Sequence, residues 1–288
     1  MSALIALSIL GGLTLVLATL LVLANKKLHV EEDPRIDRVE AMLPHVNCGA
    51  CGYPGCRSFA EALVRGEASP AQCSVGTDED HARIAAFLGV AVGEREKRVA
   101  RLACAGGSNV ARRQARYAGI ETCQAATQVS GGGKSCFWSC LGYGDCEAAC
   151  QFDAIQMNEH DLPVVSEDKC TACGDCVEVC PKDLFSLHPI SHRLWVPCKN
   201  EEAGDHILEY CQVACTACRR CAMDAPDELI TMRNNLPMVD YSKPHQTRVP
   251  IQRCPTGAIV WLEPDGTALK GRAAPKIIRR EPLKEAAT

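Results

Sequence analysis

Aromatic residues make up only 5% of this 288-residue sequence, and the net charge is a modest −4 at pH 7. So few aromatic side chains exclude a large aromatic core, and this charge gives no electrostatic reason to expect nucleic acid as a partner. No Gly-x-Gly-x-x-Gly follows a strand pattern, which argues against a nicotinamide site. A nucleophile–base pair and paired catalytic carboxylates are missing, and the eight histidines lack metal-ligand spacing. These absences leave the chain without a recognisable substrate-binding active site of its own.

Cysteine, by contrast, is abundant, with 20 residues in the chain. Three explanations compete for so many thiols: a secreted disulfide scaffold, zinc modules, or iron–sulfur clusters. The N-terminal segment helps to choose between them.

Residues 3–24 carry no charge, and as a helix they would rise about 33 Å, close to the hydrocarbon thickness of about 30 Å. A cleaved signal peptide is the alternative, but it needs basic residues before the apolar stretch. Here Lys26 and Lys27 follow it. We therefore expect an uncleaved single-pass anchor in the inner (plasma) membrane, with the C-terminal body in the cytoplasm. In that reducing compartment disulfides are disfavoured.

The first cysteine group has its thiols separated by glycines, which permit the tight turns of a metal loop. Its members are Cys48, Cys51, Cys56 and Cys73. Helices are predicted at residues 57–65 and at 78–88, the second between a cap at Thr77 and a stop at Gly89. Four thiolates suit [4Fe–4S], [2Fe–2S] or zinc alike.

The most specific pattern is Cys170-x2-Cys173-x2-Cys176-x3-Cys180-Pro181. This is the bacterial ferredoxin run, whose fourth cysteine binds the other cluster of a pair. Upstream lie Cys136, Cys140, Cys146 and Cys150. Crossed ligation predicts one [4Fe–4S] cluster on Cys136, Cys140, Cys146 and Cys180, and a second on Cys150, Cys170, Cys173 and Cys176.

The pattern recurs about 75 residues later, which indicates an internal duplication. The spacing of Cys123, Cys136, Cys140 and Cys146 matches that of Cys198, Cys211, Cys215 and Cys221. In the second copy one complete ligand set survives: Cys215, Cys218, Cys221 and Cys254. The four positions of its partner hold Ala225, Pro244, Thr247 and Pro250. Loss of one whole cluster explains this pattern and supports crossed ligation.

Sixteen cysteines are thus assigned to about four clusters, and Cys104, Cys123, Cys198 and Cys211 are left over. We expect them to be buried supporting thiols. The alternative is another cluster, or a ligand exchange near Cys136 and Cys211. The charged run at residues 94–101 is expected to be a solvated helix face or linker.

The expected fold class is α+β, with short strands following each ferredoxin motif. It comprises a transmembrane anchor (residues 1–27), a small helical [4Fe–4S] domain (28–92), a linker (93–135) and tandem bacterial-ferredoxin-like modules. The first module (136–188) is expected to hold two clusters and the degenerate second module (189–262) one, before a basic flexible tail (263–288).

The motifs NCGACGYPGC, LGYGDCEAAC, CTACGDCVEVCPK, CTACRRC and RCPTGAI, in this order behind an apolar helix, resemble the B subunit of the Rnf complex, the ion-translocating ferredoxin:NAD oxidoreductase. The resemblance covers nearly the whole chain. It implies a translocase that passes electrons between ferredoxin or flavodoxin and NAD, coupled to proton or sodium movement. The B subunit would exchange electrons with the soluble carrier, while other membrane and peripheral subunits hold flavins, bind NAD and conduct ions.

Carried over to this sequence, the family motifs imply cluster ligands at Cys48, Cys51, Cys56 and Cys73, and at Cys146, Cys150, Cys170, Cys173, Cys176 and Cys180. Cys136 and Cys140 match with a stretched spacing. Two other hypotheses stay open from the residues alone. One is a membrane-tethered zinc-binding interaction module, and the other is an electron relay of a different membrane redox system.

Overall fold

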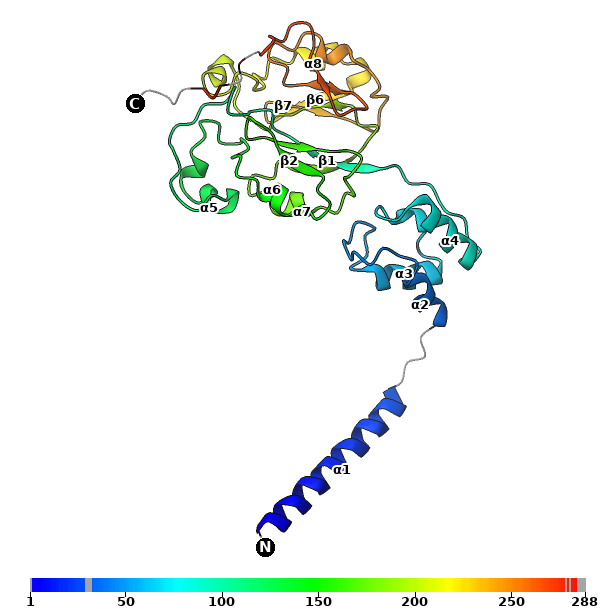
Figure 1. The fold of residues 1–288 in the computed structure, drawn as a ribbon. Coiled ribbons are helices and arrows are strands. Elements are labelled where there is room, and N and C mark those ends of the chain that lie inside the picture. The colour runs from blue at the N-terminus through cyan, green and yellow to red at the C-terminus, as the bar shows by residue number, and fades with distance from the viewer. Residues whose placement is uncertain (1, 29–32, 278, 280, 284–288) are drawn as a thin grey trace. The chain divides into compact units, whose positions relative to one another are not determined.

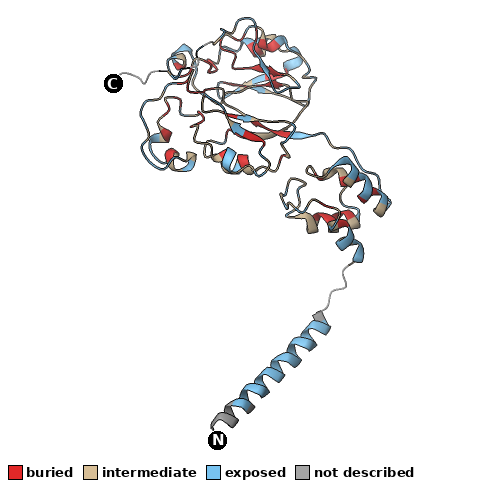
Figure 2. Cartoon of the chain, in the orientation of Figure 1, coloured by how far each residue is buried: buried red, intermediate tan, exposed pale blue. Residues whose placement is uncertain are grey.

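The computed structural model describes residues 2–28, 33–277, 279 and 281–283. The beginning of the domain expected at 28–92 and the end of the tail expected at 263–288 lie outside these residues. α1 (Ser2–Leu28) contains, at Ile9–Lys27, the one candidate membrane span found among the described residues, and none of that span is buried in the protein (Figure 2). A helix that is apolar on all sides is stable where lipid covers it.

The helical unit comprises residues 1–47, 53–70 and 77–92. It holds α2 (Pro34–Glu40), α3 (Cys56–Arg65) and α4 (Asp78–Leu88). Both predicted helices are confirmed. α4 begins at a capping box between Thr77 and Asp80 and ends at Gly89 in the left-handed conformation, as its start and stop residues require. Phe59, Leu63 and Ile84 are fully buried and form the core of this unit.

The second compact unit comprises residues 48–52, 71–76 and 93–288, and short antiparallel strand pairs run through it (Figure 1). Its first half contains β1 (Arg98–Leu102), α5 (Cys123–Thr127), α6 (Asp145–Ala148), β2 (Ile155–Met157), β3 (Pro163–Val165), α7 (Asp175–Glu178) and β4 (Phe185–Pro189). Its second half contains β5 (Leu194–Trp195), α8 (Arg220–Asp224), β6 (Ile230–Arg233), β7 (Leu236–Val239), β8 (Val260–Leu262) and β9 (Ala268–Leu269). Short 3-10 turns complete the described chain, at Pro70–Gln72, Ser130–Gly132, Asp205–Glu209, Pro226–Glu228 and Val249–Ile251.

The two hairpins of this unit pair in the same way. In β2–β3, Met157 faces Pro163, and in β6–β7, Met232 faces Pro237. Met157 and Met232 are 75 residues apart, which is also the separation of the repeated cysteines. The shared register supports an internal duplication.

The charged run at residues 94–101 is not a helix face, although residues 94–97 form no helix or strand and are mostly exposed, as a solvated linker would be. Its second half enters β1, which pairs antiparallel with β4, and Val99 and Ala100 are buried. The buried Arg101 binds Glu167 at 2.5 Å. Because the two opposite charges pair, the arginine can be buried in a strand, although the charge pattern of the sequence predicts an exposed segment. The range expected to be a linker thus contributes a strand to the core.

Apolar side chains occupy the place of the missing cluster in the second module. The core there joins Leu194, Leu229, Ile251 and Ile259, with Ala225 packed against it. The 3-10 turn that contains Ile251 contacts α8. Aliphatic side chains are therefore buried at the place where the first module has thiols.

Candidate metal centres

Three pockets of the second unit are each lined by four cysteine side chains. The α7 pocket is lined by Cys150, Cys170, Cys173 and Cys176. The α8 pocket is lined by Cys215, Cys218, Cys221 and Cys254. The α6 pocket is lined by Cys123, Cys140, Cys146 and Cys180. In the first two the thiols are the ones that the sequence groups together.

Two neighbouring helices supply thiols to both pockets of the first module. α6 carries Cys146, which lines the α6 pocket, and is followed by Cys150, which lines the α7 pocket. α7 carries Cys176, which lines the α7 pocket, and is followed by Cys180, which lines the α6 pocket. The helices lie side by side (Figure 1). This exchange is the arrangement that the ferredoxin run implies.

Backbone amides point at several of these sulfurs. The Ala154 N–H donates to Cys150 Sγ at 3.3 Å, the Ala100 N–H to Cys170 Sγ at 3.4 Å, and the Leu184 N–H to Cys180 Sγ at 3.5 Å. Such donors favour the negative charge of a thiolate, and hydrogen bonds to sulfur help to set the reduction potential of a cluster.

Burial disfavours the charged form of several of these thiols. Burial raises the pKa of Cys146 and of Cys176 to about 12, and neighbouring cysteines add to the effect. Burial likewise raises the pKa of Cys221 to about 11. A thiolate is the form that binds metal, so a cationic centre is needed to stabilise the charged form of these thiols. Groups of four converging thiols provide the donors for such a centre. The residues fit an iron–sulfur cluster.

The α6 pocket differs from the sequence expectation in one member. Cys123, at the start of α5, lines it, whereas Cys136 does not. The Cys123 and Gln124 N–H groups donate to the Asp145 carboxylate, at 2.8 and 3.1 Å. These bonds tie α5 to the first turn of α6. The sequence offers one signal for this role. Tyr143 stands where the second copy has Cys218, so the first copy needs a thiol from another position.

The N-terminal cysteine group is divided between the units. Cys48, Cys51 and Cys73 belong to the second unit, whereas Cys56 opens α3 in the helical unit. Burial raises the pKa of Cys73, with smaller contributions from Cys51 and Cys48. The Gly76 N–H donates to Cys73 Sγ at 3.3 Å, and the Cys56 N–H donates to Asn47 Oδ1 at 2.8 Å.

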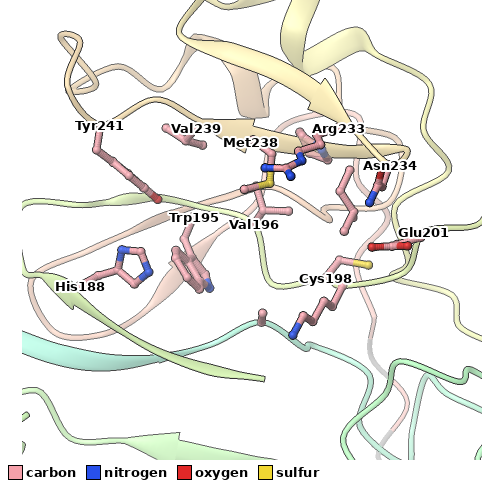
Figure 3. A pocket seen from close by; sticks show the side chains of 14 residues that line it. His188, Trp195, Val196, Cys198, Glu201, Arg233, Asn234, Met238, Val239 and Tyr241 are labelled. Carbon is pink, nitrogen blue, oxygen red and sulfur yellow. The ribbon is translucent and has the colours of Figure 1, made fainter. Parts of the chain in front are cut away.

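No group of three or more His, Cys, Asp or Glu side chains within the described residues is arranged to hold a single metal ion. A single zinc ion would draw its thiolates to about 2.3 Å from one point. Another cavity, of about 380 Å³, lies beside the β5–β7 region and is lined by His188, Trp195, Cys198 and Tyr241 among others (Figure 3).

Two family models match this chain. The model described as a putative Fe-S cluster covers residues 43–75, and the 4Fe-4S dicluster domain covers residues 138–187. The B subunit of the Na(+)-translocating ferredoxin:NAD(+) oxidoreductase complex of Acetobacterium woodii is 40% identical over 89% of this chain and 77% of its own length. The B subunit of the ion-translocating oxidoreductase complex of Methanosarcina acetivorans is 34% identical over 88% of this chain and 96% of its own length.

The chain belongs to the family of Rnf B subunits. The proton-translocating counterpart of Clostridium ljungdahlii is also 36% identical over 89% of the chain. The α+β fold class and the function expected from the resemblance are therefore confirmed: this is an iron–sulfur electron-transfer component of a membrane-bound, ion-translocating ferredoxin:NAD oxidoreductase complex. Family membership favours the Rnf hypothesis over the zinc-binding module and the relay of another redox system. The iron–sulfur clusters include a 4Fe-4S dicluster.

Proposed function

We propose that this Rnf protein accepts electrons from a soluble ferredoxin or flavodoxin at the cytoplasmic face of the membrane. It passes them through about four [4Fe–4S] clusters to the other membrane and peripheral subunits. A [4Fe–4S] cluster supplies transfer of one electron at a time. The chain's own residues hold the clusters and fix their spacing.

The observation that carries the proposal is the exchange of thiols between α6 and α7. Each helix contributes to both pockets, so two clusters would be held at a fixed separation by one pair of short helices. Around them, Ala100, Ile155 and Phe185 form an apolar core. Low exposure and backbone N–H donors are the means by which a protein tunes cluster potentials.

The proposed ligands form one set per cluster: Cys48, Cys51, Cys56 and Cys73; Cys150, Cys170, Cys173 and Cys176; Cys215, Cys218, Cys221 and Cys254; and Cys140, Cys146 and Cys180 with Cys136 or Cys123 as the fourth. The position of Lys26 and Lys27 directly after the apolar segment supports a cytoplasmic body next to the lipid bilayer.

The function is tested by mixing reduced ferredoxin with the detergent-solubilised full-length chain under anaerobic conditions. We expect the visible cluster absorption of the chain to bleach as the ferredoxin is reoxidised. Bleaching by dithionite without any bleaching by reduced ferredoxin would contradict the proposed carrier. Protease digestion of inside-out vesicles tests the orientation, because a cytoplasmic body should be cut there and protected in right-side-out vesicles.

A further inference from the structure

Four of the cysteines that the sequence leaves over or assigns with difficulty lie together. We call Cys104, Cys136, Cys198 and Cys211 the bridging group. A Cβ placed on Gly106 would lie 3.4 Å from Cys211 Sγ and 3.5 Å from Cys104 Sγ, so both sulfurs flank this glycine. Cys136 and Cys211 are buried, and Cys104 and Cys198 are partly buried. Cys198 packs against the buried core that contains Cys211, and Cys104 and Cys198 lie near both Cys136 and Cys211.

Hydrogen bonds connect the bridging group to pockets on two sides. The Cys140 N–H donates to Cys104 Sγ at 3.4 Å, and Cys140 lines the α6 pocket. The Cys215 N–H donates to Cys198 Sγ at 3.3 Å, and Cys215 lines the α8 pocket. The group therefore lies between the thiol sites of the two modules.

The duplication explains how these thiols become available. In the second copy Cys218 is the fourth thiol of the α8 pocket. The first copy has Tyr143 at the matching position, and Cys123 lines the α6 pocket instead. Cys198, the counterpart of Cys123, is thus not needed in the α8 pocket. Cys136 and Cys211 are counterparts of each other, and the residues that line the α6 and α8 pockets include neither of them.

A buried positive charge lies next to the group. Lys134 is 5% exposed, and its Nζ donates to the Gly106 carbonyl oxygen at 2.8 Å. No carboxylate within the described residues pairs with it. A buried ammonium is costly unless a negative charge lies close by, and a cluster held by four thiolates is anionic.

We propose that Cys104, Cys136, Cys198 and Cys211 bind one further [4Fe–4S] cluster between the two ferredoxin-like modules, and that Cys123 is the fourth ligand of the α6 pocket. The inference rests on the proposed iron–sulfur ligation of the other pockets. It raises the expected number of clusters from about four to about five and gives every cysteine of the chain a ligand role.

The test is the iron and labile-sulfide content of the full-length chain, purified anaerobically in detergent and counted by native mass spectrometry. We expect about twenty irons in the unaltered chain and about sixteen in Cys211→Ser. The buried neighbour Val213 supplies the matched control, since Val213→Ala disturbs the same packing and should keep all the iron. About sixteen irons in both the unaltered chain and Cys211→Ser would overturn the inference while leaving the proposed function intact. A chain without iron would overturn both.

Double variants separate the ligand sets. Cys136→Ser with Cys211→Ser should lose only about four irons, because both thiols serve one cluster, whereas Cys123→Ser with Cys136→Ser should lose about eight. If Cys136 instead completes the α6 pocket, Cys123→Ser alone leaves the iron content unchanged. The count on the unaltered chain decides the matter even where a variant fails to fold.

Discussion

The two ferredoxin-like modules share a hairpin register and a crossed thiol arrangement, yet they fill the place of the second cluster in opposite ways. The first module surrounds its α7 pocket with Cys150, Cys170 and the thiols of α7. The second packs Ile251, Leu229 and Ala225 into one apolar core. The difference teaches that the scaffold tolerates either solution, because inorganic cluster and aliphatic side chains can each fill the space between two short helices.

Removal of iron should have the largest of the expected effects, and it should destabilise the first module more than the second. Metal-dependent folds lose their binding free energy on chelation, and the thiols form much of the core around Phe185. We expect amide hydrogen exchange of the chelated, reduced chain to show early loss of protection in residues 136–188. Residues 189–262 should keep more protection, because aliphatic side chains there form much of the core beside the thiols of the α8 pocket. Equal loss in both segments would break the comparison.

A matched pair of substitutions tests the lost cluster. Cys150→Ser removes a thiol of the α7 pocket and should lower the iron content by about four atoms. Ala225→Ser changes the corresponding position of the second module, which has no thiol set to disturb, and should leave the iron content unchanged. Iron loss in Ala225→Ser would show that the second module retains a site there.

The crossed arrangement predicts a long-range effect in the second module. Cys254 lines the α8 pocket with three thiols that lie more than thirty residues earlier in the chain. Cys254→Ser should therefore lower the iron content by about four atoms, as Cys180→Ser should in the first module. Retention of full iron and an unchanged EPR spectrum in Cys254→Ser would rule out crossed ligation there.

The apolar side chains that take the place of the second cluster should stabilise the second module directly. Ile251→Ala truncates a buried side chain of the second module and should lower the free energy of unfolding by about 2–5 kcal/mol. Val177→Ala changes the corresponding, partly buried position of the first module and should have a smaller effect. Anaerobic urea titrations compare the two. A larger loss in Val177→Ala would contradict the account of the apolar core.

The smallest effect concerns the residue before each cluster helix. Gly174 precedes α7 with φ of 101°, and Arg219 precedes α8 with φ of 60°. Gly174→Ala should lower the free energy of unfolding by about 1 kcal/mol, because alanine is strained at positive φ. Arg219→Gly relieves such strain and should not destabilise the chain. The same titrations check both, and a loss in Arg219→Gly would indicate that its side chain has a further role.

Local signals in the sequence predicted much of the fold. Thr77 and Gly89 define both ends of α4, since capping is decided by neighbouring residues. β1 was missed because its burial depends on Glu167, which is distant in sequence. The same limit applies to the thiols. The α7 pocket is lined by the thiols that the spacing groups, but only the folded chain shows that Cys123 lines the α6 pocket with Cys146 and that Cys104 and Cys211 flank Gly106.

The central claim is that the body of this Rnf protein is built around cysteine-bound iron–sulfur clusters. Metal analysis of the anaerobically purified full-length chain, with iron, zinc and acid-labile sulfide measured on the same sample, tests it most directly. The account predicts at least about sixteen irons per chain with an equal amount of sulfide and no stoichiometric zinc. Zinc in place of iron, without labile sulfide, would contradict it.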